Sequence, residues 1–183
     1  MDTKKSGTIA QASPGPAPQT TKMNNQATNA HEADRPDVLA LPPLILLIFI
    51  ACALAANRLH PLPFVSGSLR YVTGAILAAL PFIIAGLAMR QMSKAGTNID
   101  VRKPSTAIVT GGVYSFTRNP MYLSMVLILI AGAFLLNNLW LLIAVPLFVL
   151  VMQRGVIQRE EHYLEKKFGE VYTAYKSRVR RWL

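Results

Sequence analysis

The stretch "MYLSMVLILIAGAFLLNNLWLLIAVPLFVLVMQ", residues 121–153, decides the fold of this chain, because it carries no charged residue over its whole length. Read as one helix it would be about 50 Å long at 1.5 Å per residue, which is too long for a single bilayer crossing. Asn137 and Asn138 stand at its centre, and asparagine is typical of turns. The stretch therefore predicts a tight hairpin of two apolar helices, residues 121–136 and 139–153.

Two further uncharged segments, residues 39–56 and 71–89, precede the hairpin. Their lengths are close to the roughly 20 apolar residues that a bilayer span needs. Helices of soluble proteins carry a polar stripe, and these segments carry almost none, which speaks against a soluble helical bundle. The sequence therefore predicts an all-α integral membrane protein with four transmembrane helices, of which the last two form the hairpin.

The basic residues are divided unevenly between the two sides of this four-helix arrangement. Seventeen of the 19 Lys and Arg residues lie before the first helix, between the second and third, or after the fourth. Arg58 and Arg70 lie on the opposite side. By the positive-inside rule both termini face the cytoplasm. As a separate expectation, the membrane is a bacterial inner membrane rather than the endoplasmic reticulum. The net charge of +10 then indicates contact with anionic lipid rather than nucleic-acid binding.

The two ends of the chain differ in composition. Residues 1–36 are rich in Ala, Pro, Thr, Asn, Gln and Ser, so we expect a disordered N-terminal tail before a membrane domain at residues 37–183. Residues 154–183 are amphipathic, with apolar residues at helical spacing, which is typical of an interfacial helix on the cytoplasmic side. Gly169 is expected to break this segment into two helices. The long connection between the second and third helices is expected to be an ordered loop at the membrane face.

Cysteine and histidine content limits the possible chemistry. Cys52 is the single cysteine, so an intrachain disulfide is impossible. The three histidines are scattered along the chain, and no metal site is expected.

The hairpin opens at Asn119 and Pro120, a pair typical of a helix start. Asparagine caps free N–H groups, and proline at the first helical position loses no hydrogen bond. A helix N-terminus favours anions through its free N–H groups and its dipole. Arg118 adds a guanidinium fork suited to a carboxylate or phosphate, and Gly111 and Gly112 allow a ligand or another helix to approach the backbone.

Glu160 and Glu161 follow the second arm of the hairpin, and the antiparallel turn returns them to the same membrane face. Ionisable residues next to an apolar segment are costly, so they are functional candidates. One pocket would then hold the guanidinium fork, the helix N-terminus, two carboxylates and the rings of Tyr114 and Tyr122. The residues alone do not decide between such a pocket and simple ion pairing of the carboxylates with nearby arginines.

A series of short motifs occurs in order along the second half of the chain. The motifs are Ile108-Val109-Thr110, Gly112, Tyr114, Arg118-Asn119-Pro120-Met121-Tyr122, Glu160-Glu161, Leu164, Phe168-Gly169, Tyr172 and Tyr175. This pattern resembles the isoprenylcysteine carboxyl methyltransferase family and its phospholipid methyltransferase relatives, over about the last half of the chain. The resemblance implies an integral-membrane enzyme that uses S-adenosylmethionine, held in the C-terminal half. Eukaryotic prenylcysteine enzymes carry His where Asn119 stands, which leaves the acceptor open.

The resemblance also implies residue roles. The implied cofactor-binding residues are Gly112, Tyr114, Arg118, Asn119, Pro120, Tyr122, Glu160 and Glu161. Arg118 or the helix N-terminus would bind the cofactor carboxylate, and Glu160 or Glu161 its ribose hydroxyls or ammonium. The expected partners are membrane lipids and a lipophilic or prenylated acceptor, with an isoprenylcysteine-like carboxylate or a lipid head group as the methylated group. A carboxylate needs no general base, whereas an amine or hydroxyl does, and the open candidates for that role are Glu160, Glu161, His162 and Tyr175.

Two other functions remain compatible with the sequence. One is a membrane reductase of similar architecture that uses a nicotinamide nucleotide, and its activity would depend on the reduced nucleotide. The other is a non-enzymatic membrane scaffold, in which Arg118 and Glu160 can be changed to Ala without loss of any ligand binding.

Overall fold

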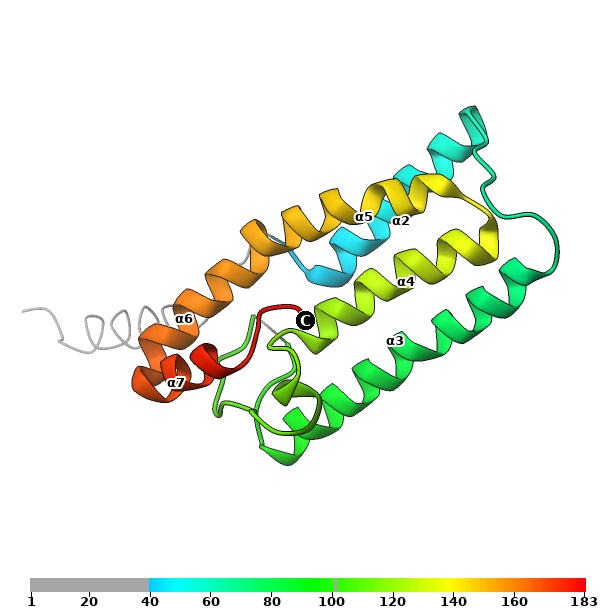
Figure 1. The fold of residues 1–183 in the computed structure, drawn as a ribbon. Helices are drawn as coiled ribbons and strands as arrows, with labels where there is room; N and C mark the ends of the chain where they lie inside the picture. Colours follow the sequence, from blue (N-terminus) through cyan, green and yellow to red (C-terminus); the bar gives the residue numbers. More distant parts are fainter. Residues whose placement is uncertain (1–39, 101) are drawn as a thin grey trace, which may run out of the picture. The chain divides into compact units, whose positions relative to one another are not determined.

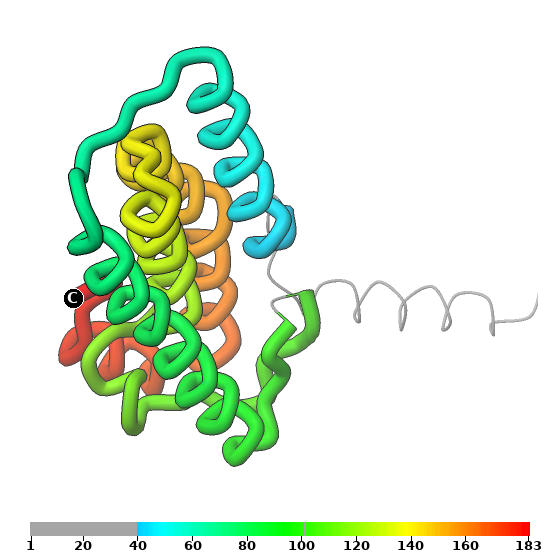
Figure 2. The backbone as a smooth tube through the Cα atoms, turned by 90° about the vertical axis from the view of Figure 1, so that its right-hand side faces the viewer, coloured from blue at the N-terminus to red at the C-terminus, as the bar shows by residue number. Residues whose placement is uncertain are grey.

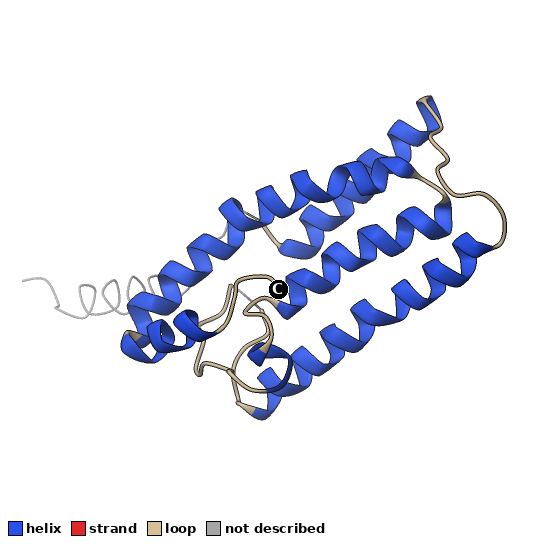
Figure 3. Cartoon of the chain, viewed as in Figure 1, coloured by secondary structure: helices blue, strands red, loops and turns tan. Residues whose placement is uncertain are grey.

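The structure is a computed structural model that describes residues 40–100 and 102–183, and all regular elements in these two ranges are helices (Figure 3). The elements are α2 (Pro42–Leu59), α3 (Leu69–Lys94), η1 (Gly112–Ser115), α4 (Pro120–Leu136), α5 (Leu139–Met152), η2 (Gln153–Ile157), α6 (Gln158–Phe168) and α7 (Glu170–Arg178). The predicted all-α fold is confirmed. The predicted tail, residues 1–36, lies outside the described residues.

The long helices form an antiparallel array in which α4 packs between α3 and α5, and α5 also packs on α2 (Figure 1 and Figure 2). The side chains of Leu129, Leu141 and Phe148 are fully buried where α4 and α5 meet. Phe49 of α2 packs edge-on against Phe148, with ring centroids 5.4 Å apart. These contacts hold α4 and α5 in a fixed alignment. The alignment sets where the segment before α4 lies relative to the segment after α5.

The α4–α5 hairpin turns at the two asparagines, as the sequence predicts. Asn137 ends α4 in the left-handed region, with φ of 50°, and its side-chain oxygen accepts hydrogen bonds from the backbone N–H groups of Phe64 and Val65, each 3.0 Å long. Asn138 caps α5, because its side-chain oxygen accepts the N–H of Trp140 at 3.0 Å. The turn therefore also anchors the connection between α2 and α3.

The second arm of the hairpin runs further than the apolar pattern predicts. The helix continues from α5 through η2, a π-helical turn, into α6, so that residues Leu139–Phe168 form one helical rod of 30 residues. The rod ends at Gly169, which has φ of 53° and ψ of −124° and separates α6 from α7. The predicted break at Gly169 is confirmed. The helix runs past the end of the apolar pattern because no proline interrupts it between Gln153 and Phe168.

The apolar helices expose hydrophobic side chains that a protein in water would bury. Leu47 of α2, Ile76 of α3 and Phe82 of α3 are 61%, 63% and 73% exposed. Three helical rods, Pro42–Leu59, Leu69–Lys94 and Leu139–Phe168, are long and apolar enough to cross a membrane, and Pro120–Leu136 is a shorter apolar helix. The chain is an integral membrane protein, whose outward faces are suited to lipid.

The connection between α3 and α4 is ordered over its described residues. The Thr97 hydroxyl oxygen accepts the backbone N–H of Thr106 at 3.1 Å, and the Asn98 amide donates to the carbonyl of Pro104 at 2.7 Å. The backbone N–H of Ser105 donates to the Tyr163 hydroxyl of α6 at 3.2 Å. These bonds hold the loop across the end of the helices, next to α6.

Close packing of α3 on α4 depends on Gly74. A Cβ atom added at Gly74 would lie 2.7 Å from Cγ and Cδ2 of Leu135 and 3.1 Å from its backbone nitrogen. Gly74→Ala should therefore lower the free energy of unfolding by about 1–3 kcal/mol, the usual cost of overpacking. The measurement is the thermal unfolding midpoint of the purified protein in detergent.

Gly86→Ala is the matched control in the same helix, because a Cβ atom there meets no atom of the described residues within 4 Å. Equal unfolding midpoints for the two variants would show that the Gly74 contact does not limit the packing of α3.

Candidate functional site

A cavity of about 460 Å³ lies where the described loop, the start of α4, and helices α6 and α7 meet. Among its lining residues are Tyr114, Arg118, Asn119, Pro120, Tyr122, Glu160, Glu161, Tyr172 and Tyr175. Its volume is within the range of about 300–1,000 Å³ that is typical of small-molecule sites. The hairpin returns Glu160 and Glu161 to the start of α4, so residues about 40 positions apart in the sequence share one cavity.

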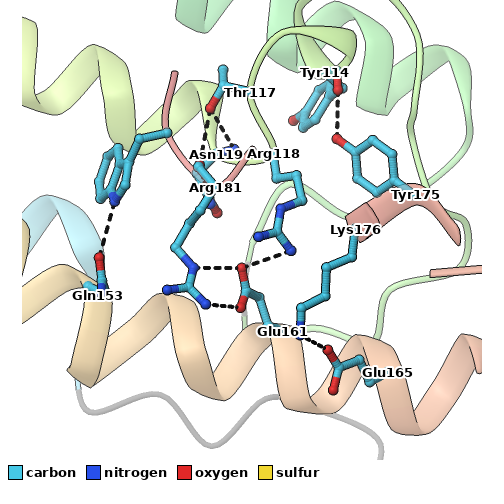
Figure 4. A network of polar contacts seen from close by, with 11 residues as sticks. Tyr114, Thr117, Arg118, Asn119, Gln153, Glu161, Glu165, Tyr175, Lys176 and Arg181 are labelled. Carbon is cyan, nitrogen blue, oxygen red and sulfur yellow. Dashed lines mark hydrogen bonds and ion pairs between the residues drawn. The ribbon is translucent and has the colours of Figure 1, made fainter. Parts of the chain in front are cut away.

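Glu161 forms the centre of a buried ion-pair network (Figure 4). Its side chain is only 7% exposed, and its two oxygens accept hydrogen bonds from Arg181: Nε to Oε1 at 2.9 Å and Nη2 to Oε2 at 2.6 Å. Nη1 of Arg118 lies 3.2 Å from Oε1. The hydrogen bonds to Glu161 raise the pKa of Arg181, so this arginine is charged at any physiological pH. One buried carboxylate thus lies between two guanidinium groups.

Residues 180–182, called the strap below, bind the start of α4 through their main chain. The Arg180 carbonyl accepts the backbone N–H of Arg118 at 3.0 Å. The Arg181 carbonyl accepts the side-chain amide of Asn119 at 2.9 Å and the Thr117 hydroxyl at 3.2 Å. The strap therefore fixes the segment that carries the predicted site residues.

The predicted capping role of Asn119 was wrong. Asn119 stands at the N-cap position of α4, but its side chain makes no capping hydrogen bond. The side-chain amide donates to the Arg181 carbonyl instead, and the Asn119 backbone N–H donates to the Thr117 hydroxyl at 3.2 Å. A cap would use the side-chain oxygen of Asn119 as an acceptor, whereas the strap binds the side-chain NH2 group and so orients the side chain toward Arg181.

Arg118 has unused hydrogen-bonding capacity. Its side chain is 8% exposed, and its Nε and Nη1 atoms have no hydrogen-bond partner among the described residues. Nη1 is within ion-pair distance of Glu161 but is not aligned for a hydrogen bond. Buried donors without partners are rare in folded proteins, because each costs the desolvation of a polar group. A guanidinium of this kind on a cavity wall is suited to an anionic ligand.

Glu160 and Glu161 are adjacent in the sequence but have different surroundings. Glu160 is half-buried and accepts a hydrogen bond from the Tyr122 hydroxyl to Oε2 at 2.8 Å. Arg181 occupies both oxygens of Glu161. Glu160 is therefore the carboxylate that retains acceptor capacity toward a ligand in the cavity.

Three tyrosines on the cavity wall are held in the neutral form. Burial raises the pKa of Tyr175 to about 12. Burial also raises the pKa values of Tyr114 and Tyr172 above the ordinary value, although the nearby Arg118 guanidinium lowers that of Tyr172 in part. The Tyr175 hydroxyl donates to the Tyr114 carbonyl at 2.7 Å (Figure 4). Tyr175 is thus better placed to fix η1 on α7 than to accept a proton.

Gly112 is not on the cavity wall. It has φ of 59°, and a Cβ atom added there would lie 1.5 Å from Nε2 of Gln91 on α3. The close approach that sequence reasoning assigned to a ligand or another helix is made by the Gln91 side chain. Gly112 therefore packs η1 against α3. His162, an open candidate for a general base, is exposed and is likewise not a lining residue.

The rest of the wall is largely apolar. Its apolar members include Leu41, Pro42, Pro43, Met92, Ile108, Val109, Met121, Met125 and Leu164. Asp100 and Arg102 also line the cavity, and hydrogen bonds from Arg102 lower the pKa of Asp100 to about 2. The cavity therefore combines a charged side near α6 and α7 with an apolar side that reaches the beginning of α2.

Sequence reasoning missed three residues of this site: Arg181, Thr117 and Tyr172. Tyr172 belongs to the motif series, which was its available signal. Arg181 is one of several arginines near the end of the printed sequence, and local pattern does not distinguish it from the exposed Arg180. Among the described residues, no three or more His, Cys, Asp or Glu side chains form a cluster that could hold a metal ion.

Comparisons with known proteins identify the family. The model of the phospholipid methyltransferase family matches residues 69–171, which is more than half of the chain. An uncharacterized protein from Haemophilus influenzae is 51% identical over 63 residues, covering 34% of this chain and 100% of that protein. No solved structure matches the chain. The match from α3 to the start of α7 includes the α4–α5 hairpin and both glutamates, and the chain therefore belongs to the phospholipid methyltransferase family of membrane proteins.

Proposed function

We propose that the protein transfers a methyl group from S-adenosylmethionine to a lipophilic acceptor at the cytoplasmic face of the membrane. The observation that carries the proposal is Arg118, a buried guanidinium on the cavity wall with two donor atoms unpaired among the described residues. Membership in a methyltransferase family supports the reaction type.

The residues of the cavity fit S-adenosylmethionine. Arg118 would hold the carboxylate of its amino-acid part, because a charged hydrogen bond of this type is about twice as strong as a neutral one. Glu160 would accept hydrogen bonds from the ammonium or the ribose hydroxyls. Tyr114 and Tyr172 offer rings that attract a sulfonium cation through the negative face of the π system. The apolar wall would receive the adenine.

When bound, S-adenosylmethionine supplies an electrophilic methyl group on a sulfonium sulfur. The residues of this chain then bind, orient and exclude water, which is the main contribution that a protein makes to a displacement reaction. Glu161 and Arg181 fix Arg118, and the strap fixes the start of α4. The apolar side of the cavity, from Leu41 to Met125, is suited to the hydrocarbon part of an acceptor that enters from the membrane.

A general base is required only for some acceptors. A carboxylate acceptor has no proton to lose, whereas an amine or hydroxyl must lose one. Glu160 is the best-placed group for that task, because Glu161 is bound by Arg181 and the Tyr175 hydroxyl donates to a carbonyl. The acceptor class itself, a carboxylate or a lipid head group, stays open.

The charge distribution supports a cytoplasmic site. Arg58 and Arg70 lie at the end of α2 and the start of α3, near the α4–α5 turn. The other described basic residues lie near the end of α3, in the α3–α4 connection, in η2, α6 or α7, or in the strap. These segments form the end of the array that holds the cavity. The positive-inside rule assigns that end to the cytoplasm.

Arg118→Gln should weaken the binding of S-adenosylhomocysteine by about ten- to a hundredfold, because a hydrogen bond to a charged group contributes about 1.5–3 kcal/mol. Isothermal titration of the purified protein in detergent measures this affinity.

Arg90→Gln is the control for the Arg118 measurement, because Arg90 is exposed on α3 and carries the same charge. Wild-type affinity in Arg118→Gln would remove the proposed carboxylate site. If the folded wild type binds no S-adenosylhomocysteine, titration with reduced and oxidised nicotinamide nucleotides separates the reductase from the scaffold.

Glu160→Gln should also lower the affinity for S-adenosylhomocysteine while the protein remains folded. The substitution keeps the size of the side chain and one acceptor for Tyr122, so that only the charge and one acceptor oxygen are lost.

His162→Asn provides the comparison for Glu160→Gln, because His162 is exposed on the same helix. The thermal unfolding midpoint of each variant monitors folding. An unchanged affinity in Glu160→Gln would contradict its binding role.

A further inference from the structure

We infer that Arg181 is a positioning residue, which holds Glu161 so that the Arg118 guanidinium stays available to an anionic ligand. The inference rests on the proposed function, because it takes Arg118 as the group that binds the ligand carboxylate. It goes further by assigning a role to the strap, which lies beyond the part of the chain matched by the family model, residues 69–171.

Glu161 has two arginine neighbours, and the structure gives them different geometries. Arg181 donates one hydrogen bond to each carboxylate oxygen, at 2.9 Å and 2.6 Å, in the bidentate arrangement that favours guanidinium–carboxylate pairs. Nη1 of Arg118 forms an ion pair with one of these oxygens at 3.2 Å (Figure 4). The same atom forms no hydrogen bond within the described residues. Arg181 is therefore the hydrogen-bond partner of Glu161, and Arg118 is an ion-pair neighbour whose Nη1 donates no hydrogen bond to it.

Removal of the Arg181 side chain would change this balance. Glu161 would lose both hydrogen bonds from Arg181 and keep only the Arg118 ion pair at 3.2 Å, and a buried carboxylate without hydrogen-bond donors is unfavourable. The nearest cation is Arg118, whose Nη1 needs only a small rotation to donate to the carboxylate. Glu161 would then take the donors of Arg118, and a ligand carboxylate would meet a neutralised pair instead of an open guanidinium.

The position of Arg181 does not depend on its own side chain. The strap is held by the main-chain carbonyls of Arg180 and Arg181, which accept bonds from Arg118, Asn119 and Thr117. It is also held by Trp182, whose indole N–H donates to the side chain of Gln153 at 3.3 Å. A substitution at Arg181 therefore removes the clamp on Glu161 and leaves the bonds of the strap in place.

The first step of the test is titration of the full chain in detergent with S-adenosylhomocysteine. Arg181→Gln should raise the dissociation constant by about tenfold or more, the effect of losing one hydrogen bond to a charged group. Arg181→Lys, which keeps the charge but only one compact donor group, should lie between wild type and Arg181→Gln. Arg180→Gln is the matched control, because it removes the same charge from an exposed neighbour in the strap.

The second step is the double variant Arg181→Gln with Glu161→Gln. It removes the carboxylate that would capture Arg118, so the affinity should return to about the wild-type value. A purely structural role for Arg181 gives the opposite result, because removal of both partners would leave binding as weak as in the single variant or weaker. Thermal unfolding midpoints of all variants verify that the proteins compared are folded.

The outcomes separate the inference from the proposed function. Wild-type protein that binds S-adenosylhomocysteine, with Arg181→Gln unchanged or with no recovery in the double variant, overturns the positioning role alone. Folded wild-type protein that does not bind S-adenosylhomocysteine overturns the proposed function and the inference together. Loss in the single variant with recovery in the double variant supports the positioning role.

Discussion

The Glu161 carboxylate lies where three segments far apart in the sequence meet: α6, the residues before α4, and the strap. A carboxylate that is 7% exposed is stable only with charged partners, and breaking a buried pair typically costs about 3–5 kcal/mol. Arg118 and Arg181 supply the compensating charge. The arrangement of the loop, the α4 start and the strap follows from this requirement, because each of them carries or fixes one of the two arginines.

The apolar hairpin makes the meeting of these segments possible. Asn137 and Asn138 reverse the chain, and the packing of α5 between α2 and α4 sets how the two arms align. Arg118 precedes the first arm and Glu161 lies in α6, the continuation of the second arm, so the alignment of the arms brings them to 3.2 Å. The membrane-facing part and the polar site are thus consequences of the same antiparallel turn.

Local patterns in the sequence predict much of this arrangement. Uncharged runs and the asparagine pair predict the helices and the turn, because apolar content and turn preference are properties of short segments. The motifs around Arg118 and Glu160 predict residues that the structure places on one cavity wall, although their roles in binding remain proposals. Gly112, Asn119 and Arg181 could not be assigned in this way. Gly112 packs against Gln91, Asn119 binds the Arg181 carbonyl, and the Arg181 side chain binds Glu161. Such contacts depend on how distant segments pack.

The π-helical turn η2 between α5 and α6 has a geometric consequence for the whole polar end. A regular α-helix turns about 100° per residue. The extra residue of one wide turn therefore rotates all later side chains about the helix axis by about that angle. Gly155, Val156 and Ile157 are buried in this turn, so the surrounding packing holds the wide turn in place. The direction in which Glu160 and Glu161 project from the helix axis is therefore set by η2, within the rod. A single-residue insertion or deletion there would redirect both carboxylates without altering either arm of the hairpin.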